Sequence, residues 1–321
     1  MSARHLALFL ARRAGALVIM LAILSFLIYS LLYLAPGSPV DILLGNQPRT
    51  PETVRLLNEK YHLDQPFLTQ YWIWAQGALQ LDFGTSILTT LPVSEEIGSR
   101  LPVSIFLGIY AYILTMIGGV GLGVLSALRR KTVVDRGIVG ASVIALSTPA
   151  FVSGVFLLFL FAITVQLFPA TGIGEDFVGR LWHLTLPAVA LALTVSAFVL
   201  KHTRAAVLAV IDQDYVTFAR ARGLSPIRIM STYVLRNALI PIVTISGLVL
   251  GSLITGAFLV EVTFSVPGIG QLLVDAAVNK DLPLIQGVAM IIAVVIILAN
   301  LLADLLYMAI DPRIRVERKS V

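Results

Sequence analysis

Long apolar runs alternate with shorter polar segments along the whole chain. A helix that crosses a hydrocarbon core about 30 Å thick needs roughly 20 consecutive apolar residues. Six runs reach that length, which predicts an all-α membrane protein with six transmembrane helices and a kink at Pro149 in the third. We expect these helices at residues 14–34, 101–128, 137–165, 181–203, 237–260 and 282–309.

The first run has two interpretations, a signal peptide or a permanent transmembrane helix. A signal peptide has an apolar region of about 7–15 residues that ends at a small-residue cleavage site. The run at residues 14–34 is longer and continues into Ala35, Pro36 and Gly37. We therefore expect an uncleaved first transmembrane helix, preceded by a short tail at residues 1–13.

The longest polar segment, residues 35–100, follows the first run. Thr50 can cap a helix over residues 51–61, because Pro51 suits the first helical position. Aromatic side chains of the kind that favour a membrane interface come next: Tyr71, Trp72 and Trp74. About 65 residues are too few for an independent enzyme core, so we expect a small subdomain.

A polar and basic segment at residues 204–236 separates the fourth and fifth apolar runs. Gly223 can adopt the left-handed conformation that ends a helix. Ser225 can cap a second helix that has Pro226 at its first position. The pattern predicts a helix, a sharp corner and a second helix.

Apolar residues recur at helical spacing through the first of these helices and predict one apolar face: Leu208, Ile211, Tyr215 and Phe218. Leu224 and Ile229 are spaced as a hydrophobic staple around the start of the second helix. On these grounds alone, the segment is either a solvated connection with incidental caps or an element with a defined shape and role.

Composition agrees with a membrane protein, since 58% of the 321 residues are hydrophobic and 13% are charged, against about 25% charged in soluble domains. The chain has no cysteine, which excludes disulfides, thiolate metal sites and a cysteine nucleophile. It also has no G-x-x-x-x-G-K-S/T stretch, the phosphate-binding loop of many ATPases. If the chain takes part in an ATP-driven process, another polypeptide must bind the ATP.

The distribution of basic residues predicts an orientation. All but six of the 23 lysines and arginines lie in the two chain ends, in residues 129–136 or in residues 201–236. Because basic residues gather on the cytoplasmic side of a membrane, both termini should be cytoplasmic and residues 35–100 extracytoplasmic. The basic residues thus follow one face of a bilayer, which argues against nucleic-acid binding.

The segment around Gly223 resembles the EAA loop of ABC importer permeases. Ala219 and Gly223 match the spacing of that motif, whereas Thr217 and Phe218 stand where the plain consensus has glutamate and alanine. The dipeptide/oligopeptide branch fits better. Segments that resemble this branch occur in order along essentially the whole chain, at residues 34–39, 63–66, 70–71, 82–86, 100–102, 169–172, 186–188, 214–224, 235–241, 264–270, 304–307 and 311–315.

The resemblance, to the B-type permease subunit, implies a multi-pass protein of a bacterial or archaeal inner membrane, with helices two to six as the permease domain. It also implies a second, homologous permease subunit, two ATP-binding cassette subunits and an extracellular solute-binding protein as partners. ATP and Mg would bind to the ATP-binding subunits, so this chain would need no catalytic residue, metal or cofactor. Its coupling loop would comprise Asp214, Tyr215, Ala219, Arg220, Ala221, Arg222, Gly223, Leu224 and Arg228. These arginines could contact the ATPase or anionic lipid.

Hydroxyl side chains near the third and fifth runs either line a translocation pathway or serve packing. The candidates are Thr244, Ser246, Ser252, Thr255, Ser147 and Thr148. Small-residue spacing at Gly119 and Gly123, and again at Gly247 and Gly251, predicts close helix contacts. The implied substrate is a di- or oligopeptide, with a nickel chelate or glutathione as alternatives.

An ion-coupled secondary transporter is the rival function. Such a protein usually has several buried acids or histidines, and only Asp304 and Glu261 are available here. Asp304 is either an anchor near the cytoplasmic end of the last run or a functional group. His183 and His202 lie at opposite ends of the fourth run and cannot share a metal ion.

Overall fold

The computed structural model describes residues 3–34, 37–44 and 48–310, and within them the only regular elements besides helices are two residues, Thr85 and Pro92, in one isolated bridge. The side chains of residues 3–12, 14, 255, 303–304 and 306–310 are not described, so the predictions for Thr255 and Asp304 lie outside the description, as does residue 311 onward. Contacts divide the chain into a first unit, Met1–Val103 with Pro267–Ile297, and a second unit, Ser104–Val266 with Leu298–Val321.

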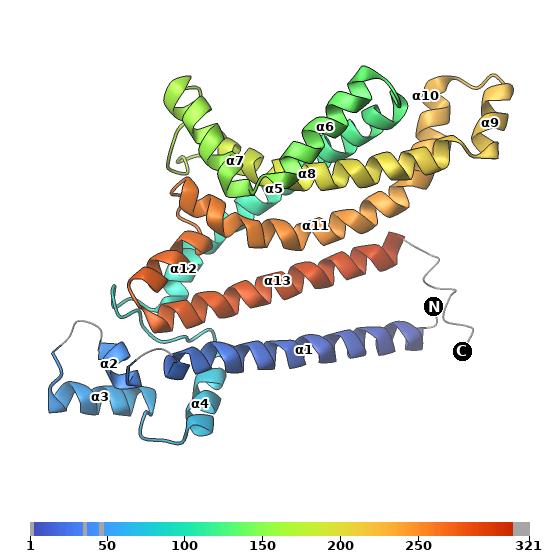
Figure 1. Ribbon diagram of the computed structural model, residues 1–321. Coiled ribbons are helices and arrows are strands. Elements are labelled where there is room, and N and C mark those ends of the chain that lie inside the picture. Colours follow the sequence, from blue (N-terminus) through green and yellow to red (C-terminus); the bar gives the residue numbers. More distant parts are fainter. Residues whose placement is uncertain (1–2, 35–36, 45–47, 311–321) are drawn as a thin grey trace. The chain divides into compact units, whose positions relative to one another are not determined.

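The first unit combines the N-terminal helices with a segment near the end of the chain (Figure 1). Its core contains the buried side chains of Phe83, Val93, Leu272 and Val288. Its elements are α1 (Ala3–Leu34), α2 (Pro39–Leu44), α3 (Pro51–Tyr61), α4 (Phe67–Leu79), the start of α5 (Val93–Leu128), α12 (Ile269–Val278) and most of α13 (Leu282–Ile310).

The predicted helix at residues 51–61 is confirmed as α3. The Thr50 side chain accepts a hydrogen bond from the Thr53 backbone N–H, and the Thr53 hydroxyl accepts from Thr50 in return. This reciprocal pair satisfies two N–H groups that the first turn leaves without helical partners. The helix ends at His62, which adopts a left-handed conformation with φ of 53°.

A buried acid, Asp281, joins the polar loop before α5 to the start of α13. The Ser86 hydroxyl donates to Asp281 Oδ2 at 2.6 Å, and the Leu88 backbone N–H donates to the same oxygen at 3.1 Å. Asp281 Oδ1 accepts from the backbone N–H of Leu284 at 3.2 Å, so the same carboxylate also caps α13.

The second unit is organised around a long helix, α8 (Phe177–Ile211), which packs against α5 and three further neighbours (Figure 1). These neighbours are α6 (Val133–Ser147), α7 (Ala150–Leu157) and α11 (Arg236–Thr263). The remaining described elements are η1 (Leu158–Thr164), α9 (Asp214–Ala221), α10 (Pro226–Arg228), η2 (Ile229–Leu235), the rest of α5 and the end of α13. Both η1 and η2 are π-helical turns.

Two glycines let α5 approach α8 closely, as their spacing predicted. A Cβ atom on Gly119 would lie 2.7 Å from Val199 Cβ, and one on Gly123 would lie 2.7 Å from Thr203 Cβ. Of the second predicted pair, Gly251 faces Asn300, with 3.0 Å between a Cβ built at Gly251 and Asn300 Oδ1.

We expect Gly123→Ala to lower the melting temperature, because overpacking a tight contact costs about 1–3 kcal/mol. The control is Gly121→Ala on the same helix, where a Cβ meets no described atom within 4 Å. That substitution gains about 1 kcal/mol of helix propensity and should be neutral or stabilising. Thermal unfolding of the purified variants in detergent compares them, and equal melting temperatures would contradict the close contact.

Five described helices are long and apolar enough to cross a membrane, and the number rises to six if one bent pair forms a single broken span. The five are Gly15–Leu34, Val93–Leu128, Phe177–Ile211, Pro226–Ile254 and Leu282–Leu302. The bent pair is Val133–Ser147 with Ala150–Thr164, at 106°. The third predicted helix, residues 137–165, is therefore broken at the predicted proline and not merely kinked.

Several helices extend beyond the predicted spans. The fifth is the clearest case, because α10, η2 and α11 form one helical run from Pro226 to Thr263. α5 begins at Val93 instead of residue 101, and α8 covers Phe177–Ile211 instead of 181–203. An apolar run marks what fits a hydrocarbon core, whereas helical hydrogen bonds continue into the polar residues on either side.

Candidate functional site

The polar segment between the fourth and fifth apolar runs forms a helical corner, residues 212–235 (Figure 1). α8 ends at Ile211, and α9 starts after Gln213. Gly223 adopts the predicted left-handed conformation, with φ of 72°. Ser225 accepts a hydrogen bond from the Arg228 backbone N–H and caps α10, as predicted. The second helix is not separate, however, because it continues through η2 into α11.

The prediction of a single apolar face through the first helix is wrong. The helix breaks between Ile211 and Asp214, so residues on either side of the break do not share a face. Tyr215 and Phe218 are exposed, at 40% and 68%, whereas Val216 and Ala219 are buried.

The corner is closed by one apolar cluster. Val216 and Ala219 pack there with residues from α5, α8, η2 and α11, including Val207 and Val234. Both staple residues belong to this cluster: Ile229 is buried, and Leu224 packs against it. The shared packing holds α9 against the start of the run that becomes α11, so the corner has a defined shape.

The outward side of the corner combines apolar and basic side chains. Besides Tyr215 and Phe218, Ile227 is 82% exposed. The predicted basic residues are also exposed: Arg220, Arg222 and Arg228. Of the other predicted residues, Asp214, Ala221 and Gly223 are exposed, Leu224 is half-buried and Ala219 is buried. An exposed apolar group with a basic rim is typical of a protein-binding surface.

A buried ion pair lies near the corner and was not anticipated from the sequence. Arg204 of α8 donates from Nε to Asp135 Oδ1 and from Nη2 to Asp135 Oδ2, both at 2.9 Å. Ser126 of α5 donates to Asp135 Oδ1 at 2.6 Å, and the Lys131 backbone N–H donates to Oδ2 at 2.9 Å. We call Ser126, Asp135 and Arg204 the three-helix joint, since they connect α5, α6 and α8.

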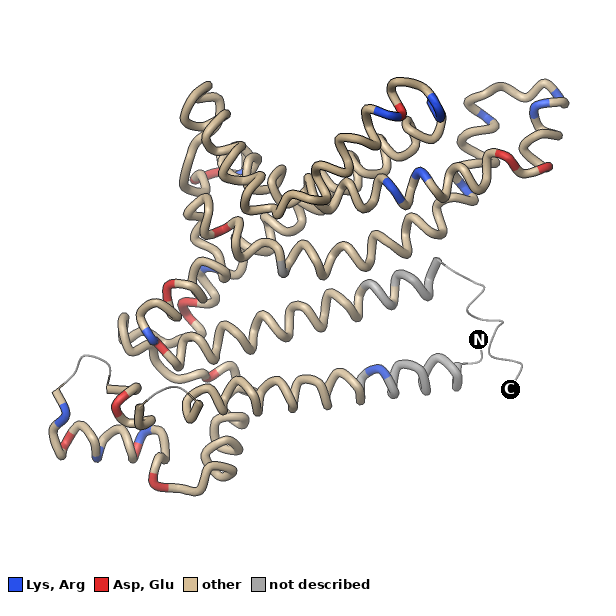
Figure 2. Tube along the Cα trace, viewed as in Figure 1, with Lys and Arg blue, Asp and Glu red and all other residues tan. Residues whose placement is uncertain are grey.

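A second, exposed ion pair joins the loop between α5 and α6 to the helical corner. The distance between Arg130 Nη1 and Asp212 Oδ2 is 2.6 Å. In the second unit, most charged residues gather at the end of α8 that carries α9 and α10 (Figure 2). One sequence feature pointed to the three-helix joint, since Asp135 is a single acid within a run of basic residues. Its partner Arg204, however, lies 69 positions away.

The proposed pathway hydroxyls bond within their own helices. Thr244, Ser246 and Ser252 donate to the carbonyl groups of Ile240, Val243 and Val249. Likewise, Ser147 and Thr148 donate to the carbonyl groups of Val143 and Ile144. Such bonds suit either packing or a weakly polar pathway, so their role stays a prediction.

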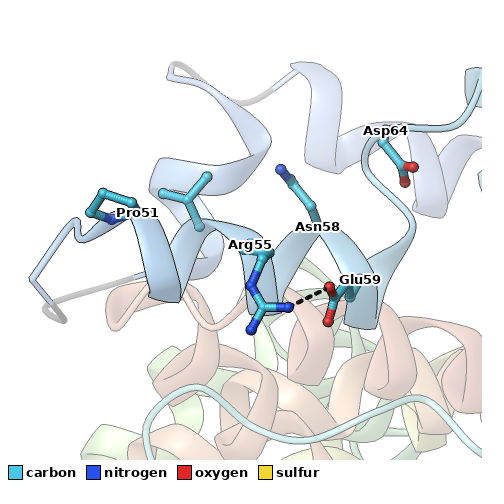
Figure 3. A pocket seen from close by; sticks show the side chains of 6 residues that line it. Pro51, Arg55, Asn58, Glu59 and Asp64 are labelled. Atoms are coloured by element: carbon cyan, nitrogen blue, oxygen red, sulfur yellow. Dashed lines mark hydrogen bonds and ion pairs between the residues drawn. The ribbon is translucent and has the colours of Figure 1, made fainter.

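A hollow of about 360 Å³ lies on α3 and is lined by Pro51, Val54, Arg55, Asn58, Glu59 and Asp64 (Figure 3). Arg55 and Glu59 form an exposed ion pair beside it, with 3.0 Å between Nη1 and Oε1. Across the described residues, no three His, Asp or Glu side chains are grouped to hold a metal ion.

Two protein-family models match this chain. Residues 119–316 match the binding-protein-dependent transport system inner membrane component, and residues 6–108 match the N-terminal component of the same kind of transport membrane protein. The chain belongs to this family. The helical corner lies within the first match, and α2 to α4 with nearly all of α1 lie within the second.

Curated relatives cover nearly the full length of this permease. A putative peptide transport system permease protein of Brucella abortus is 38% identical over 314 residues, which span 96% of this chain and 99% of the relative. A probable peptide ABC transporter permease protein of Sinorhizobium fredii is 38% identical over 310 residues, with 96% and 99% covered. The dipeptide transport system permease protein DppB of Escherichia coli is 34% identical over 333 residues, with 96% and 98% covered.

Solved structures show that the permease has the ABC importer fold. An inward-facing structure of the MetNI methionine ABC transporter superposes with a TM-score of 0.56 at 17% identity and covers 67% of this chain and 96% of that one. An amino acid ABC transporter determined with histidines has a TM-score of 0.51 at 19% identity, with 67% and 94% covered. The family predicted from the sequence is therefore confirmed.

Proposed function

We propose that this chain is the B-type permease subunit of an ATP-driven importer of di- and oligopeptides. Support comes from relatives that are named peptide or dipeptide permeases and that align over 96% of the chain. The spans agree with a weakly polar cargo path, since residues 184–200 and 237–260 contain no charged side chain. Nickel chelates and glutathione are the alternative cargoes.

The observation that carries the mechanism is the exposed apolar group on the helical corner. Tyr215, Phe218 and Ile227 project from a segment that the distribution of basic residues assigns to the cytoplasm. Burying such side chains against a partner releases water from their surfaces and is favourable. We infer that they dock on an ATP-binding subunit, with Arg220, Arg222 and Arg228 at the rim.

The corner can transmit motion because its two arms pack against each other. Its second arm belongs to the helical run from Pro226 to Thr263, and its first arm packs against that run through Val216 and Ala219. A displacement of α9 would therefore move α11. Nucleotide-driven closure of the partner would then bias the permease between inward- and outward-facing states.

The remaining components lie outside this chain. We propose a heterodimer with a second permease subunit, two ATP-binding cassette subunits that hold ATP and Mg, and an extracellular solute-binding protein that selects the cargo. The chain contains no phosphate-binding loop and acts as no enzyme by itself. Both termini would be cytoplasmic, and residues 35–100 extracytoplasmic, in a bacterial or archaeal inner membrane.

Co-purification and uptake test this function together. The tagged chain should bring down ATP-binding subunits, and vesicles with the whole assembly should take up labelled dipeptide only with ATP and the solute-binding protein. Uptake by the purified chain alone along an ion gradient would contradict the proposal and favour a secondary transporter. Uptake of a nickel chelate or glutathione, but not of peptides, would reject only the cargo.

A further inference from the structure

One side of α4 is apolar and mostly exposed, and it lies beside the exposed polar residues Thr69 and Gln76. The 13-residue helix contains no charged side chain. Leu68, Trp72, Ala75 and Leu79 fall on one side at helical spacing, and three of them are 68%, 62% and 87% exposed, in the order Leu68, Trp72 and Leu79. We propose that this side, the α4 strip, lies in the lipid interface at the end where α1 leaves the membrane.

An adjacent side of α4 packs against α1. The Phe26 ring lies 5.6 Å from Phe67 and 5.3 Å from Tyr71, measured between ring centroids. The Tyr29 hydroxyl donates to Gln70 Oε1 at 3.0 Å, and the Gln70 side chain is buried. These contacts use aromatic rings and a satisfied amide, so α4 has a fixed position against α1.

These contacts set the depth of α4. They involve the part of α1 around Phe26 and Tyr29, inside the apolar segment Gly15–Leu34. The eight residues that follow Phe26, up to Leu34, correspond to about 12 Å of helix. The α4 strip therefore lies at the level of the last part of this transmembrane segment, where the hydrocarbon core borders the lipid head groups.

The chemistry of the α4 strip fits that depth. Its helix is about 20 Å long, too short to span a hydrocarbon core of about 30 Å. Figure 1 shows α4 crossing α1 steeply, as a helix lying in the plane of the membrane must. Tryptophan is enriched at this level because its ring is apolar and its N–H is polar.

Lipid is the occupant that the neighbouring surface favours. On α1, Ile23, Leu27 and Leu34 are exposed apolar residues beside the face that contacts α4. A transmembrane helix presents such residues to lipid, and the α4 strip extends the same apolar surface. α3 differs, since its exposed residues include the Arg55–Glu59 ion pair (Figure 3).

Spin labels can test this contact directly, because the chain has no native cysteine to remove. We would place nitroxides at Leu68→Cys and Leu79→Cys, with Glu59→Cys on α3 as the water-exposed control. All three side chains are exposed, so the substitutions should not disturb packing. The assembled importer in phosphatidylcholine vesicles is then probed with oxygen, which concentrates in lipid, and with a water-soluble nickel chelate.

We expect the two α4 labels to collide with oxygen. Their collision rate with the nickel chelate should be close to zero, whereas the Glu59→Cys label should collide with the chelate freely. Chelate access equal to that control would overturn the proposal, as would protection from both reagents, which indicates a protein partner. A second measurement uses the fluorescence of Trp72, which is the only tryptophan left in this chain in a Trp74→Phe, Trp182→Phe variant. Brominated phosphatidylcholine should quench its fluorescence, and unchanged fluorescence would also overturn the proposal.

Discussion

Replacing Asp135 with asparagine is expected to lower the free energy of unfolding by about 3 kcal/mol, the low end of the cost of breaking a buried ion pair. The low end applies because the Arg204 side chain keeps 29% of its surface exposed. Asparagine cannot accept hydrogen bonds at both positions that Asp135 uses, so the bidentate contact with Arg204 and the bond from Lys131 cannot all survive. Thermal unfolding of the purified protein measures the loss.

A matched control separates burial from charge. Arg130→Ala removes the exposed ion pair with Asp212, whose side chains are 48% and 57% exposed. Exposed ion pairs contribute about 0–1 kcal/mol, so this variant should unfold close to the wild-type temperature. Asp135→Asn with Arg204→Gln should recover part of the stability, because no unpaired charge remains. Equal melting temperatures for Asp135→Asn and Arg130→Ala would contradict the role of the three-helix joint.

Phe218→Glu is expected to abolish coupling to the ATP-binding subunits while leaving the protein folded. A central apolar contact of an interface is worth about 2 kcal/mol or more, which corresponds to roughly 30-fold in affinity. A carboxylate at this position would have to be desolvated on docking. Since Phe218 is 68% exposed, the melting temperature of the isolated chain should not change. Co-purification of ATP-binding subunits and ATP-dependent dipeptide uptake measure the effect.

Thr217→Glu is the control for that variant. It introduces the same side chain one position earlier, at an exposed site in the first turn of α9. A negative charge near a helix N-terminus is favourable, and the plain EAA consensus has glutamate there. We expect normal uptake from Thr217→Glu. Wild-type uptake from Phe218→Glu would reject the docking surface, and equal losses from both variants would indicate a general intolerance of negative charge.

Local signals predicted local structure well. Thr50 and Ser225 cap α3 and α10 because a cap depends on hydrogen bonds within a few residues. Gly223 takes the predicted left-handed conformation for the same reason. Apolar length predicted helices that are long and apolar enough to cross a membrane, but periodicity failed where it was read across the break at Asp212 and Gln213. A repeat of three and four residues implies one face only while the helix is continuous.

Features that depend on distant partners could not be predicted. Prolines 102, 187 and 241 all lie inside continuous helices, whereas Pro149 stands at a sharp break. The residues around a proline do not reveal whether the helix continues or breaks there. A break frees backbone carbonyl groups, and these need hydrogen-bond partners from elsewhere in the fold. The joint between Asp135 and Arg204 likewise requires three helix ends to meet.

We expect membrane insertion of the third apolar run to depend on the fourth. α6 has 15 residues, about 22 Å of helix, and cannot cross a hydrocarbon core of about 30 Å by itself. At the break, the Thr148 carbonyl accepts a hydrogen bond from the Thr194 hydroxyl of α8 at 3.0 Å, and α8 is synthesised later. An unpaired carbonyl in lipid costs several kcal/mol. We therefore expect residues 133–164 to remain beside the translocon until α8 arrives, so that the two segments enter the bilayer together.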